Sequence, residues 1–127
     1  MKVLICGSRT FDRPELVETF LFGTQWMLPE TEKLVVIEGG CPHGGADAHA
    51  ESWARRQNHV ELVHMPADWD RHGRSAGPIR NQQMLDNNRP VDLVVAFVDK
   101  PLAESRGTAD MVRRARKAGV RTVVVAV

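Results

Sequence analysis

The sequence contains no tyrosine, only two cysteines, and few aromatic residues of any kind (6%). Cys6 and Cys41 are too few for a disulfide scaffold, so we expect a reduced, cytoplasmic protein. No apolar stretch approaches the roughly 20 residues needed to cross a bilayer. Seventeen basic and sixteen acidic side chains leave a formal charge of only +1. That balance removes the main electrostatic argument for non-specific binding to nucleic acid or to a membrane surface.

Five short apolar runs, separated by helical patterns, are the main feature that the sequence does contain. They lie at residues 3–5, 34–37, 60–63, 92–97 and 122–127. All except the third are continuously apolar, which is typical of parallel strands covered by helices on both faces. The third alternates in polarity and predicts a sheet edge. With 127 residues in all, we predict a single α/β domain over 1–127, with a five-stranded, mostly parallel sheet and helices on both faces.

Residues that favour helix starts follow several of these runs. Asp12 is expected to cap the first helix, Pro78 to open the third, and Thr108 to cap the fourth. The second helix is expected to begin near Gly45. These positions leave the segments directly after each strand as loops, where an open α/β sheet binds its ligands.

Glycines are concentrated in those loops. Gly39-Gly40 and Gly44-Gly45 lead into the second helix and predict a cradle for a phosphate, because glycine lets the backbone approach an anion. The alternative is that they only form tight turns. No Walker sequence follows, and Arg9 stands where the second glycine of a dinucleotide fingerprint would be, so neither motif is present.

Arginine is found at the same edge of the predicted sheet, at Arg9, Arg71, Arg74, Arg80 and Arg106. A guanidinium group binds phosphate or carboxylate through two hydrogen bonds, so the clustering favours an anionic small molecule. Solvated loop arginines are the alternative. Trp69 lies in one of these loops, where it either stacks on a base or packs against the sheet edge.

Metal and nucleophile chemistry are less well supported. Cys6, Cys41 and His43 are a conceivable zinc site, but they lack C-x-x-C spacing, and we predict no metal or cofactor. No partner is identified for His49, His59 or His64. Ser8 would be a nucleophile only beside a base, so contact with a phosphate or a role in a turn is favoured.

Taken together, the loop sequences resemble the YspA-like branch of the SLOG superfamily. The resemblance covers nearly the whole chain, and its motifs are Gly7-Ser8-Arg9-Thr10-Phe11, Gly39-Gly40-x-x-x-Gly44-x-Ala46-Asp47, Pro66-Ala67-Asp68-Trp69, Ala76-Gly77-Pro78-x-Arg80-Asn81-x-x-Met84 and Gly107-Thr108-x-x-Met111. SLOG domains are Rossmann-like relatives of the LOG phosphoribohydrolases and of the DNA-processing protein DprA. The resemblance therefore implies a three-layer Rossmann-like domain that binds a nucleotide or nucleotide-derived small molecule, often in bacterial or phage conflict or stress signalling.

The resemblance also implies which residues line the binding site. They are Gly7, Ser8, Arg9, Gly39, Gly40, Gly44, Ala46, Asp47, Asp68, Trp69, Gly77, Arg80, Asn81, Gly107 and Thr108. Relatives often form homodimers or higher oligomers through helices, and Phe22, Trp26 and Met27 are expected either to form such a patch or to belong to the core.

One departure bears on catalysis. LOG enzymes use a glutamate in cleaving the N-glycosidic bond, and Met111 stands at that position here. A thioether cannot transfer a proton, and neither Glu104 nor Asp110 has the family's spacing. Binding without LOG-type catalysis is therefore favoured, with no catalytic residue assigned. A phosphoribohydrolase acting on nucleoside 5′-monophosphates is the alternative, and DprA-like DNA binding is disfavoured by the near-neutral charge.

Overall fold

The computed structural model describes all 127 residues and contains one five-stranded sheet. Its strands are β1 (Lys2–Gly7), β2 (Leu34–Glu38), β3 (Val60–His64), β4 (Leu93–Val98) and β5 (Thr122–Ala126). Every neighbouring pair is parallel, and the order across the sheet is β3-β2-β1-β4-β5. The prediction of an α/β, Rossmann-like domain is confirmed, and the sheet is parallel throughout.

Five α-helices connect or follow the strands. They are α1 (Pro14–Met27), α2 (Gly45–Arg55), the single turn α3 (Trp69–His72), α4 (Ala76–Asp86) and α5 (Arg106–Lys117). Two short 3₁₀ turns, Gly73–Ser75 and Leu102–Glu104, precede α4 and α5. No helix is both long enough and apolar enough to cross a membrane.

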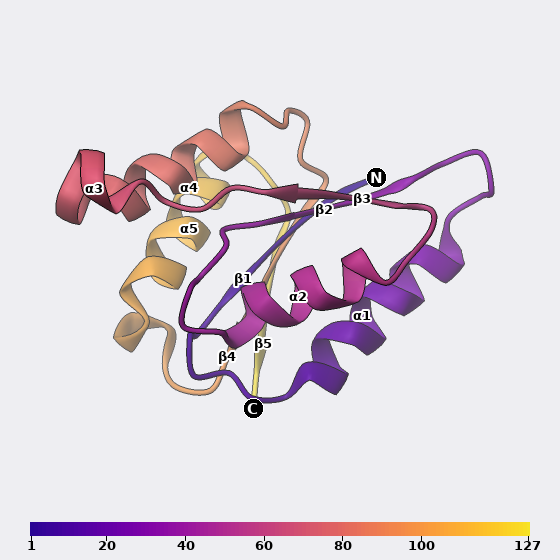
Figure 1. Cartoon of the computed structure of the whole chain (residues 1–127), viewed down its shortest axis with the longest axis horizontal. Helices are drawn as coiled ribbons and strands as arrows, with labels where there is room; N and C mark the ends of the chain where they lie inside the picture. The colour runs from indigo at the N-terminus through magenta and orange to yellow at the C-terminus, as the bar shows by residue number, and fades with distance from the viewer.

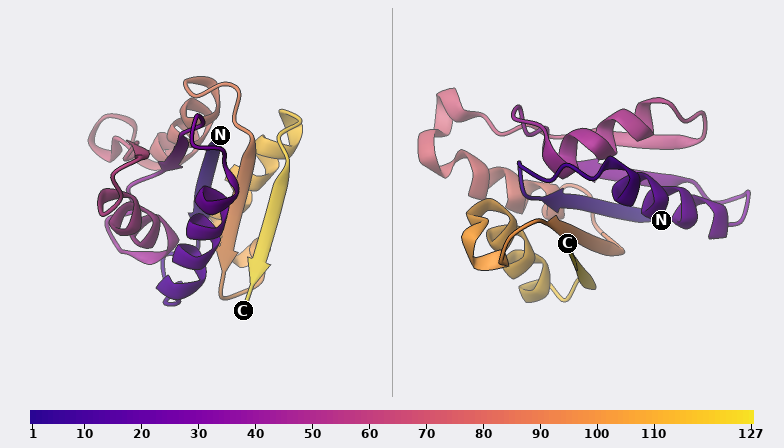
Figure 2. Two further views of the ribbon diagram at one scale, coloured as in Figure 1. Left: turned by 90° about the vertical axis from the view of Figure 1, so that its right-hand side faces the viewer. Right: turned by 90° about the horizontal axis from the view of Figure 1, so that it is seen from below.

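The sheet lies between two layers of helices, as Figures 1 and 2 show. Helices α1 and α2 pack on one face, over a core that includes Val3 and Ile5. Helices α4 and α5 pack on the other, over a core that includes Leu4 and Met111. Successive side chains of β1 thus enter opposite cores, which explains why this strand is apolar at every position.

The fifth apolar run differs from the prediction. Strand β5 forms an edge of the sheet, and Val123 on it is 38% exposed. Its uninterrupted apolar sequence is typical of a strand covered on both faces, but it pairs only with β4. Continuous hydrophobicity therefore did not distinguish this edge strand from the central ones, whereas β3 lies at the other edge as predicted.

Three predicted helix starts were wrong by one to three residues. Helix α1 begins at Pro14 and has Arg13, not Asp12, at its N-cap. Helix α4 begins at Ala76, two residues before Pro78. Helix α5 begins at Arg106, so that Thr108 lies inside its first turn. None of these three helices has a side-chain hydrogen bond at its N-cap, so capping preference did not determine where they begin.

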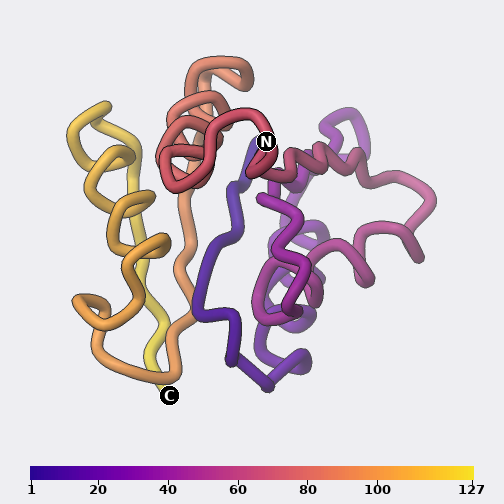
Figure 3. The backbone as a smooth tube through the Cα atoms, turned by 60° about the vertical axis from the view of Figure 1, so that its left-hand side comes forward, coloured from indigo at the N-terminus to yellow at the C-terminus, as the bar shows by residue number.

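The order in which strands are added across the sheet reverses between β1 and β4. The connections from β1 to β2 to β3 progress one way across the sheet, whereas β4 and β5 lie on the other side of β1. Figure 3 shows β1 and β4 side by side, ending at the same edge. In open α/β sheets the crevice at such a switch point is the usual ligand site.

Candidate functional site

Buried polar side chains lie at the carboxyl edge of the sheet or in the helical turns that follow it. Ser8 comes directly after β1, Glu38 ends β2, and the others lie at or near the starts of helices or, in one case, within α4. The full set is Ser8, Glu38, Asp47, Asn81, Ser105, Thr108 and Asp110. Burying polar groups is costly unless they are hydrogen-bonded, so the polar network at this edge is a specific feature of the fold.

Ser8 lies at the switch point between β1 and β4, directly after β1. Its backbone N–H donates to the carbonyl of Phe97 over 3.0 Å, and its hydroxyl is 3.0 Å from the hydroxyl of Ser105. A Cβ at Gly45 would lie 2.4 Å from the carbonyl oxygen of Ser8. Ser8 therefore lies between the starts of α2 and α5.

Ser105 was not among the predicted site residues. It precedes α5 and is buried beside Ser8. Ser105 follows a 3₁₀ turn and belongs to no recognisable motif. The only sequence signal for a role in the site was its place in the loop after β4.

Gly39, Asp47 and Arg80 form a second part of the site. The Arg80 Nη1 donates to the carbonyl oxygens of Gly39 and, over 3.4 Å, of Met65. A Cβ at Gly39 would lie 2.5 Å from Arg80 Nη1 and 3.1 Å from Asp47 Oδ2. Glycine at this position thus allows the guanidinium group, the carboxyl group and the loop backbone to lie together.

Asp47 is a buried acid at the start of α2. Burial raises its pKa to about 7, although the positive charge of Arg80 and backbone N–H groups of Cys41 and Gly39 act in the opposite direction. Burial, followed by the nearby charge of Asp47, also raises the pKa of the Cys6 thiol. A neutral, buried thiol is a poor metal ligand, which agrees with the preference for Cys6 as a core residue.

Asn81 joins α4 to α5. Its side-chain amide donates to the carbonyl of Gly107 over 3.2 Å and to Asp110 Oδ2 over 3.0 Å. Burial acts to raise the pKa of Asp110, but hydrogen bonds from Arg114 and Asn81 and the charges of Arg114 and Arg113 lower it overall. The Asp110 carboxylate is therefore committed to holding the two helices together.

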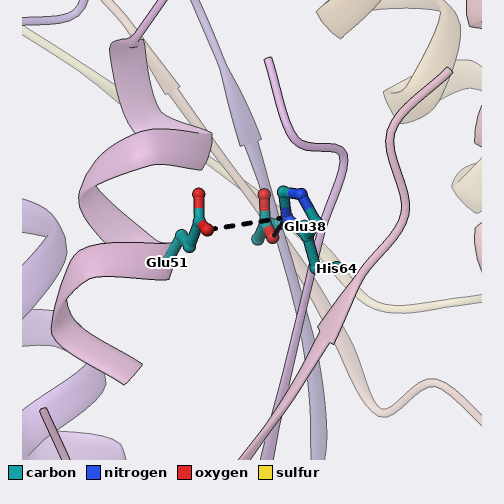
Figure 4. A group of neighbouring side chains, drawn as sticks. All are labelled: Glu38, Glu51 and His64. Atoms are coloured by element: carbon teal, nitrogen blue, oxygen red, sulfur yellow. Dashed lines mark hydrogen bonds and ion pairs between the residues drawn. The ribbon is translucent and has the colours of Figure 1, made fainter. Parts of the chain in front are cut away.

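A third polar group lies at the ends of β2 and β3 (Figure 4). The Glu38 side chain is fully buried, and its Oε2 lies 2.5 Å from His64 Nδ1. Glu51 Oε2, on α2, is 3.9 Å from the same nitrogen. The sequence identified no partner for His64, because the pairing depends on the parallel register that sets Glu38 opposite His64. His49 also has a partner, the carbonyl of Phe11 at 2.8 Å.

The Glu38, Glu51 and His64 group contains the donor atoms that a metal ion requires, within 4.8 Å of one another. However, the 2.5 Å between Glu38 Oε2 and His64 Nδ1 is a hydrogen-bond distance. Two atoms each about 2.1 Å from one ion would lie about 3 Å apart at the right angles of octahedral coordination. Arg55 also forms an ion pair with Glu51. The geometry thus favours a shared proton over a metal.

The remaining predicted residues are spread around this edge. Ala46 is buried beside Gly7, whose notional Cβ would lie 2.8 Å from the Ala46 Cβ. Thr108 is buried in the first turn of α5. Gly44 and Gly107 have open space where a Cβ would be.

Three other predicted residues, Asp68, Trp69 and Gly77, lie at α3 and the start of α4. Figure 1 shows α3 protruding from the rest of the molecule. Asp68 accepts a hydrogen bond from the Arg71 backbone N–H and so caps α3. Trp69 is 53% exposed, and its ring lies 3.5 Å from the place a Cβ would occupy on Gly77. Trp69 thus packs on the start of α4 and not on the sheet edge, with part of its ring free.

Arginine is less concentrated at the site than predicted. Only Arg80 is hydrogen-bonded into the site. The other four predicted arginines are exposed, at Arg9, Arg71, Arg74 and Arg106.

Two hollows lie away from the predicted site, over α4 and α5. One, of about 470 Å³, is lined by Arg74, Pro78, Gln82 and Arg114 among others. The second, of about 540 Å³, is lined by Gln82, Arg113, Arg114, Lys117 and Ala118. Of the residues that line them, only Arg74 belongs to the arginines predicted to favour an anionic ligand.

Met111 is the residue that the sequence resemblance aligns with the glutamate of LOG enzymes. Its side chain is 1% exposed and belongs to the core under α4 and α5. The side chain at this position therefore contributes to packing.

The comparison with known sequences agrees with this geometry. The sequence profile of the YspA, cpYpsA-related SLOG family matches residues 1–72, which include β1, β2, β3 and the loops after them. The chain belongs to this family.

A phage protein is similar to this chain over nearly its whole length. The SLOG-family chain is 37% identical to the Gene 61 protein of Mycobacterium phage D29, over 96% of this chain and 94% of that protein. No solved structure matches it. The alignment with the phage protein extends past residue 72 and so includes the α4 and α5 residues that complete the site.

Proposed function

We propose that this SLOG-family protein binds a nucleotide or nucleotide-derived small molecule at the carboxyl edge of its sheet and does not catalyse the LOG reaction. The observation that carries the proposal is the position of Ser8 between the starts of α2 and α5. Neither helix has a hydrogen bond from an N-cap side chain, which leaves N–H groups of both first turns without that partner. Helix N-termini favour phosphate through these groups and the helix dipole.

Gly44 and Gly107 support the same proposal. Gly44 precedes α2 with φ of 94°, and Gly107 lies in the first turn of α5. Both have open space in the direction of a missing Cβ. A phosphate can therefore approach the backbone at each helix start without meeting a side chain.

Arg80 supplies a positive charge at the Gly39–Asp47 loop that leads into α2. It is half-buried and held by the carbonyls of Gly39 and Met65. A guanidinium group that is fixed in this way loses little conformational entropy when an anion binds. We assign Arg80 to contact with the phosphate or an adjacent polar group of the ligand.

The positions of Met111 and Asp110 support binding without LOG-type cleavage. Met111 is buried in the core, and Asp110 is occupied by Asn81, Arg113 and Arg114. Neither provides the free carboxylate that N-glycosidic cleavage needs. The relative in a mycobacteriophage supports a role for this binding in the sensing or sequestration of a nucleotide signal.

The test is a binding measurement with AMP, ADP-ribose, NAD and cyclic AMP. We expect at least one of them to raise the melting temperature, since saturation at a hundred times Kd stabilises the fold by about 2.7 kcal/mol. Gly39→Ala should weaken that binding at least tenfold, because its Cβ displaces Arg80. The clash is with the far end of the Arg80 side chain, which can rotate away where a backbone atom could not, so the fold should remain intact.

Gly23→Ala, in α1, is the matched control, because its Cβ meets nothing within 4 Å. It should bind as the parent protein does. Failure of all four compounds to bind would refute the proposal. Release of free base from AMP, lost in Arg80→Ala, would establish the phosphoribohydrolase in its place.

A further inference from the structure

The Glu38–His64 pair is a feature of the carboxyl edge that the proposed function does not use. Glu38 Oε1 accepts a hydrogen bond from the Gly40 N–H over 2.7 Å, and Oε2 is bonded to His64 Nδ1. The carboxyl group is fully buried. Both of its oxygens are therefore occupied by the protein and turned away from any ligand.

The imidazole is held by one nitrogen and free at the other. His64 is 35% exposed, and Nδ1 makes its only hydrogen bond in the structure. A Cβ at Gly40 would lie 3.1 Å from His64 Nε2 and 2.7 Å from Cε1. The free Nε2 thus lies beside the backbone of the Gly39–Asp47 loop, which leads to the proposed phosphate cradle.

The end of β2 has a particular role in sheets of this order. In dinucleotide-binding folds an acidic side chain there accepts hydrogen bonds from the ribose hydroxyls, whereas a cationic side chain nearby accommodates a phosphate on the ribose. Glu38 stands at this point but cannot accept from a ribose. The group that this chain presents to a ligand at that position is His64 Nε2.

Protonation of the pair determines what Nε2 offers. When the pair carries one proton, it lies between Glu38 and Nδ1, and Nε2 is an acceptor. When the pair carries two protons, Nε2–H is a donor. This holds both for an imidazolium beside a carboxylate and for a neutral imidazole beside a carboxylic acid. Only the second state suits a phosphate, since the pair is then neutral overall and has a donor pointing outwards.

The other charged groups near the imidazole are paired with one another. Glu51, 3.9 Å from Nδ1, is bound by Arg55 on the same helix. Asp47 on α2 lies near Arg80, which reaches the loop from α4. Neither leaves an uncompensated negative charge to repel an anion at Nε2.

We propose that His64, held by Glu38, contacts the ligand directly and selects nucleotides that carry a second phosphate, on the 2′ or 3′ oxygen of the ribose. The inference rests on the proposed function, since it assumes that a nucleotide occupies the carboxyl edge. His64 is the specificity-determining residue, and Glu38 is a positioning residue that acts through it. Phosphate binding at Nε2 is coupled to uptake of one proton by the pair.

The experiment compares adenosine 2′,5′-bisphosphate and adenosine 3′,5′-bisphosphate with AMP by calorimetry at pH 6 and pH 8. We expect one bisphosphate to bind about tenfold more tightly than AMP at pH 6, as one charge-assisted hydrogen bond would give. The preference should shrink at pH 8. Ionisation of the phosphate alone would change it in the opposite direction, because its second pKa is about 6.

Variants separate the imidazole from other causes. His64→Gln should abolish the preference while AMP still binds, and Glu38→Gln should abolish its pH dependence. His59→Gln, at an exposed position directly before β3, should retain both. Thermal denaturation without ligand checks that each variant folds, and His64→Asn replaces His64→Gln if that variant does not.

Four outcomes overturn the inference. If AMP and the bisphosphates bind equally, or if His64→Gln retains the preference, a nucleotide site exists but His64 does not select its ligand. If EDTA removes the preference, the Glu38, Glu51 and His64 group holds a metal ion and not a proton. If no nucleotide binds at either pH, the proposed function itself fails, and the inference fails with it.

Discussion

Asp47 belongs to the proposed site, and burying its carboxyl group lowers the stability of the fold. It is 9% exposed, and burial raises its pKa to about 7. A carboxyl group in the unfolded chain ionises near pH 4. Between those values the folded protein holds a proton that the unfolded chain has released, so rising pH favours unfolding. The buried acid therefore destabilises the fold at neutral and alkaline pH.

We expect Asp47→Asn to remove this dependence on pH. The variant should be more stable than the parent at pH 8, by up to about 4 kcal/mol, and the difference should vanish as pH falls from 7 towards 4. Urea denaturation at a series of pH values measures it. Asp70→Asn, at an exposed position on α3, is the control and should follow the parent. Parallel profiles for Asp47→Asn and the parent would contradict the expectation.

At the scale of elements, Gly7 determines how closely α2 approaches the centre of the sheet. A Cβ there would lie 2.2 Å from the carbonyl oxygen of Phe97 on β4 and 2.8 Å from Ala46 on α2. The obstacle at Phe97 is backbone, which cannot rotate away as a side chain can. Three elements therefore meet at a point where only a hydrogen atom fits.

Gly7→Ala should consequently destabilise the fold by about 3 kcal/mol or more, because strand, helix or both must shift. Urea denaturation gives the free energy of unfolding. Gly107→Ala, in the first turn of α5 with nothing near its Cβ, should keep or slightly raise the stability. A Gly7→Ala variant as stable as the parent would show that β1 and β4 are not packed as described.

At the scale of the whole molecule, the end of α1 presents an apolar surface. Phe22, Trp26 and Met27 are 58%, 80% and 84% exposed, and the rings of Phe22 and Trp26 are stacked with centroids 6.4 Å apart. Of the two alternatives left by the sequence, the core is thus excluded for these residues. Contiguous exposed apolar side chains usually mark an interaction site.

We expect a second copy of the chain to cover this surface. Trp26→Glu should then convert a dimer to a monomer in sedimentation or light-scattering measurements, without loss of helical content. Val123→Glu, at an exposed position on β5, is the control and should remain dimeric. A parent protein that is monomeric at all concentrations would contradict the expectation.

Much of the architecture followed from the sequence because its cause is local. The continuous apolar runs of β1, β2 and β4 predicted central parallel strands, and the glycines after them predicted the edge at which Ser8, Asp47 and Arg80 meet. Helix starts were less well predicted, since Arg13 and Ser105 stand at N-caps without a capping bond. The preference of a side chain for the N-cap contributes only a small free energy, and tertiary packing readily outweighs it.

The sequence by itself determined the fold class, the edge of the sheet that carries the glycine loops, and the absence of a glutamate at Met111. Each depends on which residue stands at which position along the chain. Only the tertiary structure brought Glu38 to His64, Ser8 to Ser105, and Asn81 to Asp110. These pairs are 26 to 97 residues apart, and their contact depends on strand register and helix packing, which no local pattern contains.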